Sequence, residues 1–82
     1  MNFPDAIKYR ITKLAKEHDL SIYAVAMASG IPSSTLNDFF RGKVELPRMD
    51  TILHISEGFG MELKDFFDDP VFKNVEYDRN TK

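Results

Sequence analysis

A short run of hydrogen-bonding side chains is the part of the sequence best equipped for chemistry. Within residues 32–41 the apolar side chains Leu36, Phe39 and Phe40 recur at helical spacing and occupy one side of a helix. The other side carries hydroxyl, amide, carboxylate and guanidinium groups, on Ser33, Ser34, Asn37, Asp38 and Arg41. Such groups bind another molecule through hydrogen bonds and charge. We therefore interpret this helix as the working surface, which the rest of the chain holds at a fixed angle.

No arrangement for catalysis accompanies these groups. The sequence has no combination of Ser, His and acid, no glycine loop for phosphate and no paired-carboxylate motif, so an enzyme is not predicted. His18 and His54 have no neighbouring ligand pattern, and cysteine is absent, so no metal site or other cofactor is expected. The pair Asp68-Asp69 is interpreted as a solvated helix end.

Length and charge narrow the class of protein. The 82 residues are enough for one small domain. The net charge of −2 hides an asymmetry, because residues 1–48 carry seven basic and five acidic groups, and residues 49–82 carry four and eight. Only the first part could approach a polyanion. No apolar run is long enough to span a bilayer, and the N-terminus lacks a signal-peptide pattern, so a cytoplasmic protein without a membrane partner is expected.

The first two helices are predicted from capping signals and apolar spacing. The run from Asn2 to Asp5 begins a helix that ends near His18, with Ile7, Ile11, Leu14 and Ala15 inward and Lys8, Arg10, Lys13 and Lys16 on other faces as solubilising charge. The apolar run from Leu20 to Ala28 would also suit a buried strand. Helix is favoured by Ser21 as N-cap, by three alanines and by the lack of a second strand to pair with.

The remaining elements follow in order. Residues 29–32 break the second helix, the third runs to Gly42, and residues 43–48 form a loop. Asp50 opens a fourth helix with Ile52, Leu53, Ile55 and Phe59 facing inward, and Met61 to Phe67 forms a fifth. We divide the chain into a domain at 1–69 and a tail at 70–82. The tail carries Val71, Phe72, Val75 and Tyr77, and three alternatives stay open for it: it packs on the body, it pairs with a dimer partner, or it frays.

The spacing of small and apolar residues across residues 22–41 has a specific physical reason. A small residue at Ala26 lets two helices approach, and Gly30 makes the turn between them. The apolar residues Val25, Ile31, Leu36 and Phe39 fill the wedge between the two helices. This unit resembles the helix-turn-helix of the lambda-repressor-like family of bacterial and phage regulators, also called XRE or Cro-like. The similarity extends from Leu14 to Phe67 and includes Arg41-Gly42-Lys43, Pro47, Thr51-Ile52-Leu53, Gly60-Met61, Leu63 and Phe66-Phe67.

The resemblance implies an all-α, five-helix domain that binds double-stranded DNA, usually as a homodimer, and regulates transcription. In that family the early part of the third helix reads base edges, which implies base contacts by Ser33, Ser34, Asn37 and Asp38. Phosphate contacts are implied for Thr35, Arg41 and Lys43. Two residues depart from the pattern. Ile22 replaces a common phosphate-binding Gln, and Asp38 would repel phosphate unless it accepts from a cytosine amino group or pairs with Arg41.

The prediction is a sequence-specific DNA-binding regulator, a repressor, that reads the major groove with its third helix. Two other functions stay open. An antitoxin would bind its own promoter and hold a protein partner through the apolar Tyr23 and Met27 side or through the tail. A protein-interaction bundle would have lost DNA binding altogether. The residues Ser33 to Thr35 could also serve only as a helix cap.

Overall fold

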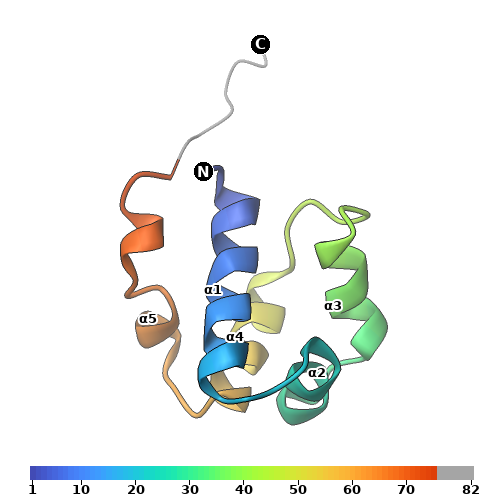
Figure 1. The fold of residues 1–82 in the computed structure, drawn as a ribbon. Coiled ribbons are helices and arrows are strands. Elements are labelled where there is room, and N and C mark those ends of the chain that lie inside the picture. Colours follow the sequence, from blue (N-terminus) through green and yellow to red (C-terminus); the bar gives the residue numbers. More distant parts are fainter. Residues whose placement is uncertain (76–82) are drawn as a thin grey trace.

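The fold is a bundle of short helices around one core (Figure 1). The computed structural model describes residues 1–75, and within them no element is a strand. The helices are α1 (Phe3–Glu17), α2 (Ile22–Ser29), α3 (Ser33–Phe40), α4 (Met49–Gly58) and α5 (Leu63–Phe66), followed by the 3-10 helix η1 (Pro70–Phe72). All five predicted α-helices are present, and the all-α prediction is confirmed. The fifth is shorter than expected, because Met61 and Glu62 precede its first turn.

Local signals explain where α1 begins and ends. The Asn2 side chain accepts from the backbone N–H of Asp5 at 2.9 Å, and a proline occupies the first turn, where no N–H is needed. At the other end the His18 N–H donates to the Leu14 carbonyl at 2.9 Å. The chain then turns through Asp19, whose φ of 58° is left-handed. The buried face of α1 consists of Ala6, Ile7, Arg10, Ile11, Leu14 and Ala15.

The core is built from every α-helix. Its largest buried hydrophobic side chains are aromatic and branched aliphatic groups, which exclude water from the space between the five α-helices. The cluster comprises Ile7, Ile11, Leu14, Ala15, Val25, Ala26, Leu36, Phe39, Ile52, Ile55, Phe59 and Phe66. Among residues 1–75, no helix is both long enough and apolar enough to cross a membrane.

Helix α2 packs closely on α4 because two small residues meet there. A β-carbon built on Gly58 would lie 2.6 Å from Ser29 Oγ, which is closer than real β-carbons approach another atom, and 3.0 Å from Ser29 Cα, which is a tight contact. The buried Ser29 hydroxyl donates to the Val25 carbonyl of its own helix at 2.7 Å, so it needs no partner on α4. Glycine at position 58 therefore sets the distance between α2 and α4.

We expect Gly58→Ala to lower the free energy of unfolding by about 2 kcal/mol, because the added methyl group overpacks this contact. Urea unfolding followed by circular dichroism measures the change. Ser29→Ala removes the nearest atom, so the double variant should lose less stability than the sum of the two single variants. A Gly58→Ala protein as stable as the wild type would contradict the close contact.

Leu53 was expected to face inward, and this prediction is wrong. Its side chain is 38% exposed, whereas Ile52 and Ile55 are buried. Successive helical residues differ by about 100° in direction, so the stripe defined by Ile52, Ile55 and Phe59 leaves Leu53 at its edge. An apolar residue next to a buried stripe is not necessarily part of it.

Arg10 and Asp69 were both expected on the solvated surface, and both are buried. Arg10 donates through Nη1 to Asp69 Oδ2 at 3.2 Å and through Nε to the Phe66 carbonyl at 2.7 Å. Lys13 approaches the same carboxylate oxygen at 2.9 Å. The Asp69 Oδ1 atom accepts from the Val71 N–H at 2.8 Å, so it also caps η1. A buried charge needs such partners. Through them the Asp69 carboxylate holds the segment that begins at Asp69 against α1.

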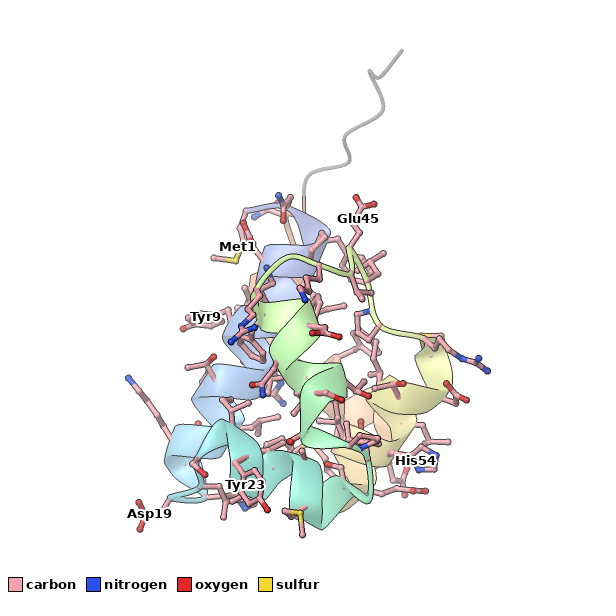
Figure 2. All side chains as sticks on the ribbon, turned by 90° about the vertical axis from the view of Figure 1, so that its right-hand side faces the viewer. Met1, Tyr9, Asp19, Tyr23, Glu45 and His54 are labelled. Atoms are coloured by element: carbon pink, nitrogen blue, oxygen red, sulfur yellow. The ribbon has the colours of Figure 1, made fainter. Side chains whose placement is uncertain are left out.

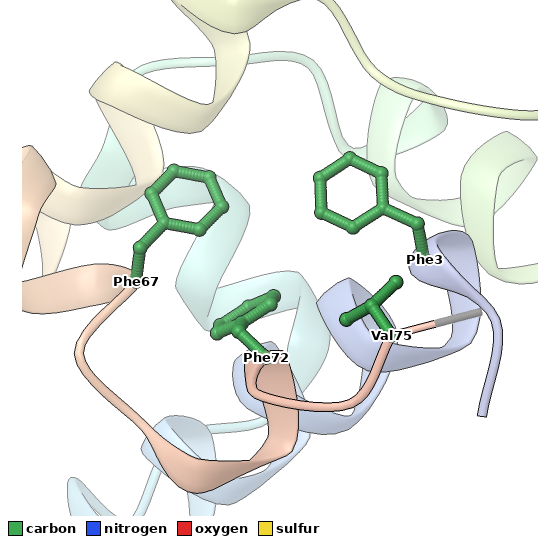
Figure 3. A pocket seen from close by; sticks show the side chains of 4 residues that line it. All are labelled: Phe3, Phe67, Phe72 and Val75. Atoms are coloured by element: carbon green, nitrogen blue, oxygen red, sulfur yellow. The ribbon is translucent and has the colours of Figure 1, made fainter. Parts of the chain in front are cut away.

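Residues 70–75 lie against α1 and α5. Phe72 packs on Phe3 and Phe67, with ring centroids 6.3 and 5.1 Å away. With Val75 these rings line an open apolar cavity of about 380 Å³ (Figure 3). Figure 1 shows η1 and α3 on opposite sides of α1. The cavity beside η1 therefore lies away from α3. Tyr77 and the rest of the expected tail lie outside the described residues.

Candidate nucleic-acid interface

Helices α2 and α3 are joined by a turn whose geometry depends on glycine. Ser21 begins α2 by accepting from the Ala24 N–H at 3.0 Å. Gly30 ends it with a left-handed φ of 72°, and the Ile31 N–H donates back to the Ala26 carbonyl at 3.1 Å. This pattern is a Schellman motif, in which a left-handed residue lets the last carbonyls of a helix be satisfied. The chain can then start α3 at Ser33.

The six residues singled out as a scaffold lie at this junction. Val25, Ala26, Leu36 and Phe39 are almost completely buried, and Ile31 is partly buried against the same core. The sixth is Gly30, in the turn. Because Leu36 and Phe39 are the two buried residues of α3, this helix is fixed by its inner side alone. Its outer side is left to solvent.

The polar residues predicted for contact lie on that outer side. Ser34 and Asn37 are exposed, and Ser33, Thr35 and Asp38 are partly exposed. Figure 2 views the molecule from this side. The N-cap of α3 is Pro32, with no side-chain cap hydrogen bond, so the serines do not serve as the cap. Within residues 1–75, none of these five side chains is hydrogen-bonded to the protein.

Positive charge follows directly after α3. Arg41 and Lys43 are exposed, on either side of Gly42 with its left-handed φ of 83°. The Lys43 N–H donates to the Asp38 carbonyl at 2.9 Å, which fixes the start of the loop against α3. Arg48, just before α4, is 84% exposed in its side chain and approaches Asp50 at 3.2 Å. Arg48 was not among the residues predicted to contact DNA. Its position just before a predicted helix start was the one feature of the sequence that could have indicated an exposed basic group there.

The loop between α3 and α4 adds residues that sequence reasoning missed. Val44 and Leu46 are 43% and 41% exposed, and they help line a cavity of about 230 Å³. Thr35 and Asp38 of α3 lie on its other wall. The predicted polar face and this loop therefore form one surface.

Two helices joined through a left-handed glycine, the second with a polar exposed face and basic residues at its end, define a helix-turn-helix module. Residues 10–70 match the family model of the Cro/C1-type helix-turn-helix DNA-binding domain, and the chain belongs to this family. The resemblance inferred from the sequence is thus confirmed. The family consists of DNA-binding domains, and catalysis is not typical of it.

Comparison with solved structures gives a similar protein. The crystal structure of the prophage Lp1 protein 11 superposes with a TM-score of 0.78 and is 29% identical in sequence. The match covers 92% of this chain and 100% of that chain. No curated protein matches the chain.

Proposed function

We propose that the protein is a sequence-specific, double-stranded-DNA-binding transcriptional repressor that reads the major groove with α3. The observation that carries the proposal is the outer face of α3. Its hydroxyl and amide groups are accessible and are not engaged by the helix cap or by other described residues. Buried Leu36 and Phe39 hold the opposite face, so α3 can enter a groove without losing its packing.

The charge distribution supports the same proposal. Phosphate oxygens position a protein on the duplex, whereas base edges determine the preferred sequence. Arg41 and Lys43 are exposed just after α3 and would bind the backbone beside the groove that Ser33, Ser34 and Asn37 would read. Asp38 would accept from a cytosine amino group. With few basic groups per subunit, binding should have modest affinity and a moderate salt dependence.

A homodimer belongs to this proposal. Two copies of α3 spaced about 34 Å apart would meet successive major grooves on one side of the duplex. Selection of bound duplexes from a random library, at two salt concentrations, tests function and assembly together. A two-fold symmetric motif supports a dimeric sequence-specific regulator. Failure to select any sequence at low salt would overturn the proposal and leave a protein-interaction bundle.

The reading face can be tested directly with Ser34→Ala and Asn37→Ala in one protein. We expect specific affinity to fall by at least about tenfold, since a good bidentate pair, such as Asn37 with an adenine, is worth about 1–3 kcal/mol of discrimination against the wrong base, and the Ser34 contact is lost as well. Both positions are exposed, so the melting temperature should change little. Fluorescence anisotropy with the selected duplex measures the specific affinity, and the same measurement with a scrambled duplex gives the non-specific affinity.

Thr12→Ala with Asn74→Ala provides a matched control. It removes one hydroxyl and one amide from exposed positions outside α2, α3 and the following loop. This control should bind the selected duplex as the wild type does. Unchanged binding by the Ser34 and Asn37 variant would show that the reading face has been assigned to the wrong residues.

A second function has a specific observation in its favour. Tyr23 and Met27 are 63% and 62% exposed and lie one turn apart on α2, a helix without a charged residue. Figure 2 shows Tyr23 at the surface of α2. An apolar surface of this kind suits a protein partner, as an antitoxin would need. Co-purification of a second chain, lost after Tyr23→Ser with Met27→Ser, would support this function. Retention of the partner by that variant would contradict it.

A further inference from the structure

The loop between α3 and α4 exposes apolar side chains where charged ones would be expected. Val44 and Leu46 are 43% and 41% exposed, although Lys43 and Arg48 flank them closely. The residue between them, Glu45, projects away from the body of the molecule at the tip of the loop (Figure 2). The loop thus presents its carboxylate outward, whereas its two apolar side chains line a cavity together with residues of α3.

Val44 and Leu46 line a cavity together with residues of α3. Its volume is about 230 Å³, and Thr35 and Asp38 contribute the α3 wall. The lining is mostly apolar, and it is continuous with the polar face of α3 through Thr35. The cavity is smaller than the roughly 300–1,000 Å³ of typical small-molecule pockets. A small apolar group attached to a larger partner fits it better than a free ligand does.

The charges around the cavity indicate which partner that is. Exposed Arg41, Lys43 and Arg48 complement the phosphates of a duplex lying across α3. The cavity wall itself carries one carboxylate, on Asp38, and one guanidinium, on Arg48. Their charges oppose each other and the rest of the lining is mostly apolar, so an uncharged base edge suits the cavity better than a phosphate does. The apolar group that bases present in the major groove is the 5-methyl group of thymine.

We propose that this cavity receives the 5-methyl group of a thymine, with Val44 and Leu46 as contacts that determine specificity. The inference rests on the proposed DNA-binding function and assigns to the loop a part in base recognition beside that of α3. Thymine would then be preferred at one position of each half-site because only thymine supplies the methyl group. Burial of one methyl group corresponds to about a fourfold gain in affinity.

The test uses the full chain and duplexes carrying deoxyuridine, which differs from thymidine only by lacking this methyl group. Each thymine of the selected site is replaced singly, and the Kd is measured by fluorescence anisotropy. We expect about a fourfold loss at one thymine of each half-site. The Val44→Ser, Leu46→Ser protein should bind the thymine and deoxyuridine duplexes equally at that position. Both substituted side chains are exposed, and thermal melting verifies that this protein is folded.

Leu53→Ser is the matched control, because it removes an exposed leucine of α4 that does not line the cavity. It should keep the fourfold difference. Equal binding of all deoxyuridine duplexes by the wild type would overturn the inference while leaving the proposed function intact. A difference that persists in the Val44→Ser, Leu46→Ser protein would also overturn it. If no duplex is bound at all, the proposed function fails, and the inference fails with it.

Discussion

Asp69→Ala is expected to lower the free energy of unfolding by about 3 kcal/mol, because it leaves the buried Arg10 guanidinium without its carboxylate. This is the lower end of the usual cost of breaking a buried ion pair. Arg10 keeps two acceptors in the variant, the carbonyls of Phe66 at 2.7 Å and Asp65 at 2.9 Å. Loss of the cap on the Val71 N–H adds to the effect. Urea unfolding monitored by circular dichroism gives the difference.

The neighbouring residue supplies the control. Asp68 is exposed and has the same side chain, so Asp68→Ala should change stability by less than about 0.5 kcal/mol. If the two variants were equally stable, Asp69 would not hold the end of the chain on α1. If both were strongly destabilised, the loss would come from local helix-end charge and not from the buried ion pair.

The same contact gives the pH dependence a defined direction. The Val71 N–H, together with Lys13 and Arg10, holds the pKa of the Asp69 carboxyl below its usual range, against the opposing effect of burial. The stabilisation is therefore complete above the unfolded-state pKa of about 3.9 and is lost as pH falls through the lower folded-state pKa. Asp69→Asn should reduce the decline in stability over this acid range, which unfolding curves between neutral and acid pH measure.

The helix-turn-helix could be predicted from the sequence because its requirements are local. A small residue at Ala26 and a glycine at position 30 are needed within a few residues of each other, and apolar spacing assigns Leu36 and Phe39 to the core. The structure has the left-handed turn at Gly30 and buries both side chains. Residues close in the chain therefore determined this part of the fold.

The ion pair between α1 and the end of the described chain could not be predicted in the same way. Arg10 and Asp69 are 59 positions apart, and a basic residue on an amphipathic helix is ordinarily solvated. One signal was present. Arg10 falls between Ala6 and Leu14 at intervals of four, in line with two buried residues. A charge within an apolar stripe indicates a buried partner without identifying it.

The surface that we propose contacts DNA was predicted only for the part that helical periodicity defines. Spacing separates the polar side of α3 from its buried side, and the structure exposes Ser34 and Asn37 accordingly. The loop after α3 has no period, so the shared cavity of Val44 and Leu46 with Thr35 depends on how the chain returns to α4. Such a cavity arises from tertiary packing, which local patterns do not specify.

Phe39→Ala is expected to lower the free energy of unfolding by about 3–5 kcal/mol, because the aromatic ring is 1% exposed and fills the core beneath α3. The Lys8 ammonium of α1 lies 5.3 Å from the ring centroid, so the same ring connects α1 with α3. A small domain has only about 5–15 kcal/mol of stability. Chemical denaturation at low temperature, where the variant retains folded molecules, measures the loss.

Phe40→Ala separates the role of the core from that of the aromatic pair. Phe40 packs edge-on against Phe39 with centroids 5.7 Å apart, but it is only partly buried. Its removal should cost clearly less stability and leave DNA binding largely intact, whereas Phe39→Ala should weaken both. Equal losses in the two variants would mean that the pair acts as one unit. A selective loss for Phe39→Ala would show that the buried ring holds the outer face of α3 in position for binding.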